Sequence, residues 1–394
     1  MLRKFLARLF ARKGQTASPR TAAYCKARAR LGPDDLDGVH RGLAAKIPDR
    51  LAPHDNWCGR RVKVVDGSSV SMPDTPENQR AYPQPQAQKP GCGFPVMRIV
   101  AMFSLASGVI IELARDALSV HERDLFRRLW HLFEPRDVAL ADRGFCSFAD
   151  IYHLGLRGVD CVMRKNQGRK SLKAIKRLGK NDRIVRWEKT MTCPTWLTRE
   201  QWKQMPDTMD LREIKVAVEI AGFRTQNLVI VTTLLDRILF PAGKFAELYR
   251  RRWAAELSLR DIKTTMGMEV LRCKSPRMVE KEVTMYLIAH NLVRAVMMEA
   301  ATAYRTPITE LSFKGTVATI RQWAPIMADD ELDPSERADL YLKMLYYIAK
   351  DQLPQRPNRS EPRAIKRRPK AYQYLTKPRG EFNELPHKSR YRKA

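Results

Sequence analysis

The sequence lacks several features that would place it in common protein classes. Its seven cysteines form no C-x-x-C pair, and no Cys/His cluster has zinc-ligand spacing, which argues against a zinc module. Scattered cysteines without a secretory signal are typical of free thiols in a reducing cytosol. No run of about 18 apolar residues occurs, because Ser104, Ser107 and Gly108 interrupt the best candidate at 99–113. We therefore expect a protein that does not span a membrane.

Acidic residues are also scarce. The 394-residue chain has 43 Asp and Glu against 72 Lys and Arg, a formal net charge of +29, and residues 1–30 contain no acid. A protein this basic usually binds a polyanion, and nucleic acid is the first candidate. Charge alone does not distinguish a DNA partner from an RNA partner, or an enzyme from a packaging protein. The length and the 44% hydrophobic content leave room for a large core and more than one domain.

Strand-like and helix-like runs alternate in the first half of the chain. Two apolar runs separated by Ala106-Ser107-Gly108 predict a hairpin, and the element order fits a mixed five-stranded sheet with helices on its faces. This α/β order is that of a ribonuclease-H-like core. The predicted strands are 61–65, 96–105, 109–113, 137–141 and 159–163. The predicted helices run from Ser119 to Phe133 and onward from Ser147.

The second half changes in character. Strand-like runs at 183–187, 211–220 and 228–234 surround a stretch rich in Trp, Pro and Thr, which predicts a β-rich insertion that interrupts the core. Helices are expected at 244–266 and 280–303. We expect six segments: a basic helical N-terminal segment (1–60), the first part of the core (61–165), the β-rich insertion (166–240), the rest of the core with its helix (241–305), a C-terminal helical region (306–354) and a basic flexible tail (355–394).

The most informative stretch runs from Tyr249 to Lys263. Tyr249, Arg252, Glu256 and Lys263 follow one another at helical steps, so a helix would hold them within a sector of roughly 60°. The alternative is a solvated charged face stabilised by the Arg252–Glu256 pair. A neighbouring apolar stripe would bind this helix to a core: Leu248, Ala255, Leu259, Ile262 and Met266.

Three carboxylates share one physical setting. Asp66 and Asp142 each follow a predicted buried strand, and Glu256 lies on a helix that can pack beside that sheet. An oxygen-only set without His or Cys suits Mg²⁺ or Mn²⁺. Two such ions roughly 4 Å apart activate the attacking oxygen and stabilise the leaving oxygen of a phosphodiester. Arg252 and Lys263 would supply cations for the developing charge.

Each acid also has a structural alternative. Asp66-Gly67-Ser68-Ser69 is typical of a turn, and Asp142-Arg143 is compatible with an exposed pair at a strand end. Asp137, Asp160 and Asp236 flank strand-like runs as well. The combination with the Tyr249 helix favours Asp66, Asp142 and Glu256.

This combination resembles the DDE transposases of bacterial insertion sequences, specifically the insertion-sequence-four type with its Tyr-Arg-Glu-Lys signature. The resemblance covers nearly the whole chain at many ordered points. Besides the signature helix, it includes 23–28, 65–68, 82–84, 93–95, 141–146, 231–236, 271–274 and 361–364.

The resemblance implies a specific site and activity. Asp66, Asp142 and Glu256 would be the catalytic metal ligands for Mg²⁺, with Mn²⁺ as a substitute and two ions expected. Tyr249, Arg252 and Lys263 would contact the DNA backbone near the cleaved bond. The family cuts and pastes its element by metal-dependent cleavage and strand transfer of double-stranded DNA, as a homodimer on paired ends, in the bacterial cytoplasm at the nucleoid. Relatives usually carry a longer N-terminal DNA-binding domain, so a shortened one is expected at 1–60.

The gap between Asp142 and Glu256 is too long for one connection and must contain folded material, which is the predicted insertion. In this family the insertion can hold a displaced base against a tryptophan, and Trp187, Trp196 and Trp202 are candidates. The alternative for each is an ordinary core tryptophan.

Two other functions stay open from the sequence. One is a metal-dependent nuclease on the same core, which cuts DNA without joining strands. The other is a non-catalytic DNA-binding descendant of a transposase. Clustered carboxylates repel DNA unless a metal ion is present, a cost that chemistry explains and simple binding does not.

Overall fold

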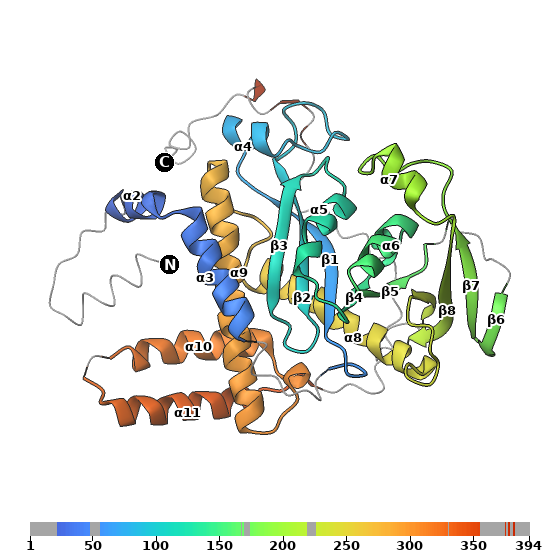
Figure 1. Ribbon diagram of the computed structural model, residues 1–394. Helices are drawn as coiled ribbons and strands as arrows, with labels where there is room; N and C mark the ends of the chain where they lie inside the picture. The colour runs from blue at the N-terminus through green and yellow to red at the C-terminus, as the bar shows by residue number, and fades with distance from the viewer. Residues whose placement is uncertain are drawn as a thin grey trace, which may run out of the picture.

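A large mixed sheet with helices on both faces forms the centre of the computed structural model (Figure 1). The structure describes residues 22–47, 56–166, 168, 174–218, 226–329, 331–354, 375, 377–378 and 381–382. Within these ranges, the side chains of 22–24, 218, 226 and 253–256 lie outside the described part.

Nine strands in the described ranges form this single sheet. They are β1 (Val62–Ser71), β2 (Val96–Ser104), β3 (Ile110–Ala117), β4 (Val138–Ala141), β5 (Asp160–Arg164), β6 (Ala174–Gly179), β7 (Asp182–Glu188), β8 (Thr208–Val218) and β9 (Gln226–Thr232). Their order across the sheet is β3-β2-β1-β4-β5-β9-β8-β7-β6. β1 pairs antiparallel with β2 and parallel with β4, and β4 pairs parallel with β5. These pairings agree with the element order predicted for the first half of the chain.

The prediction of a five-stranded sheet was wrong, because the sheet continues beyond β5. β9 pairs antiparallel with β5, with Val162 opposite Thr232, and β8, β7 and β6 follow. The predicted β-rich insertion therefore extends the central sheet. A sheet that ended at β5 would leave a row of unpaired backbone groups along that edge, and β9 satisfies them.

Side chains alternate between two cores, one on each face of the sheet. Val64 faces a core shared with α8 (Ala242–Arg260) and α9 (Pro276–Ala303), and Val65 faces a core shared with α5 (Glu122–Arg128) and α6 (Phe148–Leu156). All four residues of β4 are buried, in the same alternation. The α8 and α9 core includes Met97, Ile99, Val138, Leu140, Phe245, Leu248, Val279 and Val283.

Two predicted helix bounds need correction. The helix expected from Ser119 to Phe133 begins only at Glu122, because His121 caps it by accepting from the backbone N–H of Arg123. It ends at Arg128 and continues as the short 3-10 helix η3 (Trp130–Leu132). The prediction for Ser147 is confirmed, since its hydroxyl accepts from the backbone N–H of Asp150 at the start of α6.

The helix expected at 244–266 is interrupted near its end. α8 stops at Arg260 and one π-helical turn follows, η5 (Asp261–Thr265), in which the N–H of Met266 donates to the carbonyl of Asp261 at 2.9 Å. Lys263 therefore does not keep the angular position that a regular α-helix would give it. Such π turns inside helices often mark functional sites.

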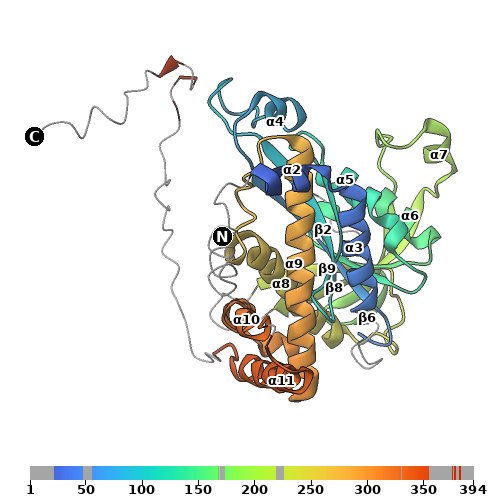
Figure 2. The same cartoon turned by 90° about the vertical axis from the view of Figure 1, so that its left-hand side faces the viewer.

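The remaining helices surround this framework. They are α2 (Ala22–Arg30), α3 (Pro33–Lys46), α4 (Pro76–Ala81), η4 (Arg143–Phe145), α7 (Arg199–Gln204), η6 (Ile308–Glu310), α10 (Phe313–Met327) and α11 (Pro334–Lys350). α3 and α9 lie side by side (Figure 2), joined by a hydrogen bond from the Thr284 hydroxyl to Asp37 at 2.9 Å. Within the described ranges, every helix is too short or too polar to cross a membrane.

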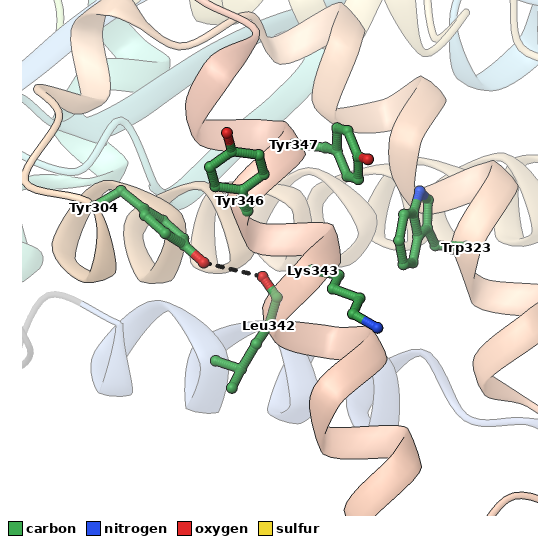
Figure 3. Close-up of a pocket in the computed structure, with 6 residues that line it drawn as sticks. All are labelled: Tyr304, Trp323, Leu342, Lys343, Tyr346 and Tyr347. Carbon is green, nitrogen blue, oxygen red and sulfur yellow. Dashed lines mark hydrogen bonds between the residues drawn. The ribbon is translucent and has the colours of Figure 1, made fainter.

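The α10–α11 hairpin packs on the end of α9 and carries an aromatic hollow of about 600 Å³ (Figure 3). The Tyr304 hydroxyl donates to the carbonyl of Leu342 at 3.2 Å. The rings contact one another, with 5.7 Å between the centroids of Trp323 and Tyr347. Of the described residues that line this hollow, Lys343 is the one that carries a charge.

A buried guanidinium joins the extended sheet to the start of α8. Arg212 on β8 is fully buried, and its Nε and Nη2 donate to the carboxylate of Asp182 on β7 at 2.8 and 2.6 Å. Its carbon Cζ lies 5.3 Å from the ring centroid of Phe245 on α8. Its Nη1 donates to three backbone carbonyls in the segment before α8: Leu234, Asp236 and Phe240.

We expect Arg212→Leu to lower the free energy of unfolding by about 3–5 kcal/mol, because it leaves the Asp182 carboxylate buried without its cation. Urea-induced unfolding would measure the change. Arg186→Leu is the matched control, since Arg186 on β7 forms an exposed ion pair with Asp210 and its loss should change stability little. Equal effects of the two substitutions would contradict a structural role for the buried cation.

Candidate active site

The pairing of β1 with β4 brings Asp66 and Asp142 together. The last pair of this parallel ladder is Val65 with Ala141, so Asp66 is the next residue on β1 and Asp142 directly follows β4. Asp66 shares the strand face of Val64, and Asp142 that of Leu140, which is the face covered by α8. Both carboxylates are partly exposed. The structure thus brings together the two aspartates that the sequence predicts at strand ends.

The turn predicted at Asp66-Gly67-Ser68-Ser69 is wrong. β1 continues through these residues to Ser71, paired with β2 along its length, with Asp66 opposite Ala101. The long antiparallel ladder outweighs the local turn preference of this sequence. The pairing of β1 with β4 stops just before Asp66. From Asp66 onward, the edge of β1 that faced β4 has no paired strand beside it in the part of the chain that the structure describes.

Asp142 begins a tightly anchored loop. Its carbonyl accepts the backbone N–H of Phe145 at 3.1 Å, which closes the 3-10 turn η4. The Phe145 ring is buried and packs edge-on against Phe126 of α5, with 5.4 Å between ring centroids. This packing fixes the backbone that carries Asp142.

Tyr249 connects α8 to Asp142. Its hydroxyl donates to Oδ1 of Asp142 at 3.2 Å. Burial of the ring, the nearby Asp142 charge and this hydrogen bond raise the pKa of the Tyr249 phenol, so it stays protonated and donates near neutral pH. The Arg252 guanidinium lies 5.1 Å from the Tyr249 ring centroid. Only 6% of Tyr249 and 7% of Arg252 is exposed, so both face the core side of the helix.

Lys263 makes the second connection, to β1. Its Nζ donates to the hydroxyl of Ser68 at 2.9 Å, two residues after Asp66. The α8–η5 helix therefore contacts the sheet edge at Asp142 through Tyr249 and beside Asp66 through Lys263. Glu256 lies midway between Tyr249 and Lys263 on α8, and its side chain is outside the described part.

One acid near the site escaped the sequence prediction. A Cβ built on Gly67 would lie 2.7–2.9 Å from the carboxylate group of Glu122, the first residue of α5. Gly67 faces the opposite side of β1 from Asp66, so Glu122 lies behind the site. Among the described residues, no cation or hydrogen-bond donor contacts this carboxylate. An acid in the first turn of a helix usually indicates only a favourable dipole interaction, so the sequence holds no signal for this contact.

Two of the three tryptophans considered for base stacking lie in the core, and the third is partly buried. Trp187 is fully buried and Trp202 is 8% exposed. Trp196 packs against the same core, with the Arg127 guanidinium 4.2 Å from its ring centroid. The positions of Trp187 and Trp202 agree with the structural alternative, core tryptophan, whereas Trp196 stays partly exposed.

The donor chemistry fits a hard divalent cation. Asp66 and Asp142 offer carboxylate oxygens at one sheet edge, and Arg252 and Lys263 bring positive charge to the same edge. Among the described side chains, which omit Glu256, no three Asp, Glu, His or Cys residues lie close enough to hold a metal ion.

We expect Gly67→Ala to push the Glu122 side chain out of its preferred rotamer. This should lower the free energy of unfolding by about 0.5–1.5 kcal/mol. In a Glu122→Ala background this cost should disappear, so a double-mutant cycle on the free energy of unfolding should give a coupling of the same size. Gly144→Ala is the control, because nothing lies within 4 Å of its added Cβ. Additive effects of Gly67→Ala and Glu122→Ala would show that the two positions do not touch.

Comparison with known proteins identifies the family. The model of the "Transposase DDE domain" family matches residues 57–292. The transposase InsG for insertion sequence element IS4 of Escherichia coli (strain K12) is 29% identical over 367 residues, which cover 91% of this chain and 78% of that protein. The putative transposase InsZ of the same strain is 25% identical over 127 residues, 32% of this chain and 42% of that protein.

A solved structure of a piggyBac transposase synaptic complex with hairpin DNA resembles the fold at a TM-score of 0.39 and 8% identity. The match covers 71% of this chain and 56% of that chain. The family assignment depends on the sequence comparisons. Because the domain model spans more than half of the chain and every predicted site position, the chain belongs to the transposase DDE domain family and is a DDE transposase.

Proposed function

We propose that this transposase cleaves DNA at the ends of an insertion sequence and transfers the cut strands to a target, with Asp66, Asp142 and Glu256 as its catalytic acids. Members of the family act on DNA and depend on a divalent metal ion. The observation that carries the assignment of residues is the meeting of β1, β4 and α8 at one sheet edge. The β1–β4 register brings the two aspartates there, and Tyr249 attaches the Glu256 helix to Asp142.

We assign the core to the ribonuclease-H-like fold. The strand order β3-β2-β1-β4-β5, with three antiparallel strands followed by two parallel ones, supports this assignment. The core would comprise 61–165 and 241–305, with 166–240 as the β-rich insertion and 306–354 as a helical region. Of the ends, 1–21, 48–55 and most of 355–394 lie outside the described residues.

The proposed cofactor is Mg²⁺, with Mn²⁺ as a substitute and two ions bound. When bound, such a pair of ions activates the attacking oxygen and stabilises the leaving oxygen of the phosphodiester. Asp66, Asp142 and Glu256 would hold the ions through carboxylate oxygens, the ligands these hard cations prefer.

The remaining site residues would position groups around these acids. The protonated phenol of Tyr249 donates to Asp142 and orients its carboxylate. Lys263 is the most accessible of the three predicted DNA-contact residues and would offset the charge that develops on the phosphate beside the cleaved bond. Tyr249 and Arg252 are almost fully covered, so their contact with the DNA backbone would require the side chains above them to move when DNA binds. Lys263 is already held at the edge of the site by Ser68.

The proposed oligomeric state is argued from the reaction, which acts on the two ends of one insertion sequence. We propose that a homodimer holds two insertion-sequence ends, so that cleavage and joining are coordinated. We place the protein in the bacterial cytoplasm at the nucleoid, where its double-stranded DNA substrate lies.

The test uses a plasmid that carries the DNA flanking the gene, incubated with Mg²⁺ or Mn²⁺. We expect the wild-type protein to cut at the element ends and to give joined products. Glu256→Gln, Asp66→Asn and Asp142→Asn should each lower the cleavage rate by about 100-fold or more, because each removes a ligand. Gel analysis of cut and joined DNA would measure both activities.

Asp236→Asn is the matched control, because Asp236 also follows a strand but its carboxylate accepts only the backbone N–H groups of Ile238 and Leu239 among the described residues. It should cut as the wild type does. Cleavage without joining would indicate a nuclease. DNA binding with no cleavage by any of the proteins would contradict the catalytic proposal.

A further inference from the structure

A basic groove lies beside the signature helix, where α8 and η5 meet α9 and α10. It encloses about 570 Å³. α10 contacts η5 directly, and residues of α8 and α10 line the same groove. Its charged lining residues are Arg260, Asp261, Arg294, Lys314 and Arg321.

Among the described residues of this lining, cations outnumber acids four to one. Arg260, Lys314 and Arg321 are exposed, and among the described residues none of their side chains forms an ion pair or a hydrogen bond. Lys314 and Arg321 are seven residues apart on α10 and therefore share one helix face. Cations that outnumber the acids around them repel one another, and binding a polyanion relieves that repulsion.

The fourth cation is fixed at the side of the groove. The Nε of Arg294 donates to the carbonyl of Ser107 at 2.9 Å, so this guanidinium is held in place by the β2–β3 turn. The single acid, Asp261, is half-buried, and its burial raises the pKa of its carboxyl group. Five hydroxyl residues also line the groove: Ser258, Thr264, Thr265, Thr309 and Ser312. The rest of the lining is apolar: Leu257, Ile308, Leu311, Phe313, Val317, Ala318 and Leu353.

This mixture of guanidinium, ammonium and hydroxyl groups matches the groups that proteins use to contact DNA phosphates. The groove also lies next to the proposed catalytic position, because its lining on α8 begins at Leu257, the residue after Glu256. Arg260 lies four residues after Glu256, one turn further on the same side of the helix. Arg260 is also three residues before Lys263, so a DNA strand held at Lys263 would pass close to Arg260.

We propose that the groove between α8–η5 and α10 binds the sugar–phosphate backbone of DNA adjacent to the cleaved bond. The inference rests on the proposed function, because it takes the DNA to be the strand that enters the Asp66–Asp142–Glu256 site. Arg260, Lys314 and Arg321 would contact phosphates, and Arg294 would supply a fixed positive charge beside them. The aromatic hollow of the α10–α11 hairpin has no comparable group of cations. Lys343 is the one charged residue among the described residues that line it (Figure 3).

The first test measures the salt dependence of DNA binding. The probe is a fluorescein-labelled duplex carrying the DNA that flanks the gene, and anisotropy gives the Kd at rising KCl. Each phosphate contact adds about one to the slope of log Kd against log salt, so Lys314→Gln/Arg321→Gln should lower that slope by about two.

The control removes the same charge from exposed residues of the neighbouring helix, as Lys343→Gln/Lys350→Gln on α11. Its slope should equal that of the wild type. Circular dichroism of both double variants would check that they fold alike. Equal slopes in the two double variants would overturn the proposal.

A second test needs no substitution. Lysines of the wild-type protein are acetylated with and without the same duplex, and tryptic peptides are quantified by mass spectrometry. DNA should protect Lys314 several-fold and leave Lys343 unchanged. Acetylation of Lys314 at the same rate with and without DNA would overturn the proposal.

Parallel cleavage assays with the wild-type protein separate this inference from the proposed function. If the wild type cuts the element ends while Lys314 stays unprotected, the groove proposal fails and the catalytic one stands. If Lys314 is protected but no metal-dependent cutting occurs, the groove binds DNA and the catalytic proposal fails. If the wild type does not bind the duplex, both fail.

Discussion

The backbone pairing of β1 with β4 is the constraint on which the site depends. This parallel ladder ends at Val65 and Ala141, so Asp66 and Asp142 leave it side by side, on the face that α8 covers. Rigid strand ends hold catalytic groups more precisely than loops do. A shift of one residue in this register would turn one of the aspartates to the opposite face.

The position of α8 depends on contacts from both halves of the chain. Tyr249 and Lys263 attach it to Asp142 and Ser68 at the sheet edge. At its start, Arg212 of β8 binds the carbonyls of the segment that leads into the helix. The strands that extend the sheet beyond β5 therefore also support the helix that carries Glu256. This link gives the extended sheet a physical role in the geometry of the site.

The sequence predicted the features that depend on local pattern. Continuous apolar runs predict buried strands such as β4. Asp66 and Asp142 directly follow two such runs, so the sequence predicts that both lie at strand ends. Features that depend on distant partners were missed. The sequence Asp66-Gly67-Ser68-Ser69 is typical of a turn, but pairing with β2 makes it part of a strand. The pairing of β9 with β5 depends on both strands, and neither sequence alone predicts it. The contact of Glu122 with Gly67 joins elements that carry no shared motif.

The most direct test of the account asks whether the three acids surround one metal site. Fe²⁺ with ascorbate and peroxide cuts a polypeptide where the ion is bound, and mass spectrometry locates the cuts. We expect cuts beside Asp66, Asp142 and Glu256, suppressed by excess Mg²⁺ and lost in Asp66→Asn. Cuts confined to other parts of the chain, or cuts that Mg²⁺ does not suppress, would contradict a shared metal site at this sheet edge.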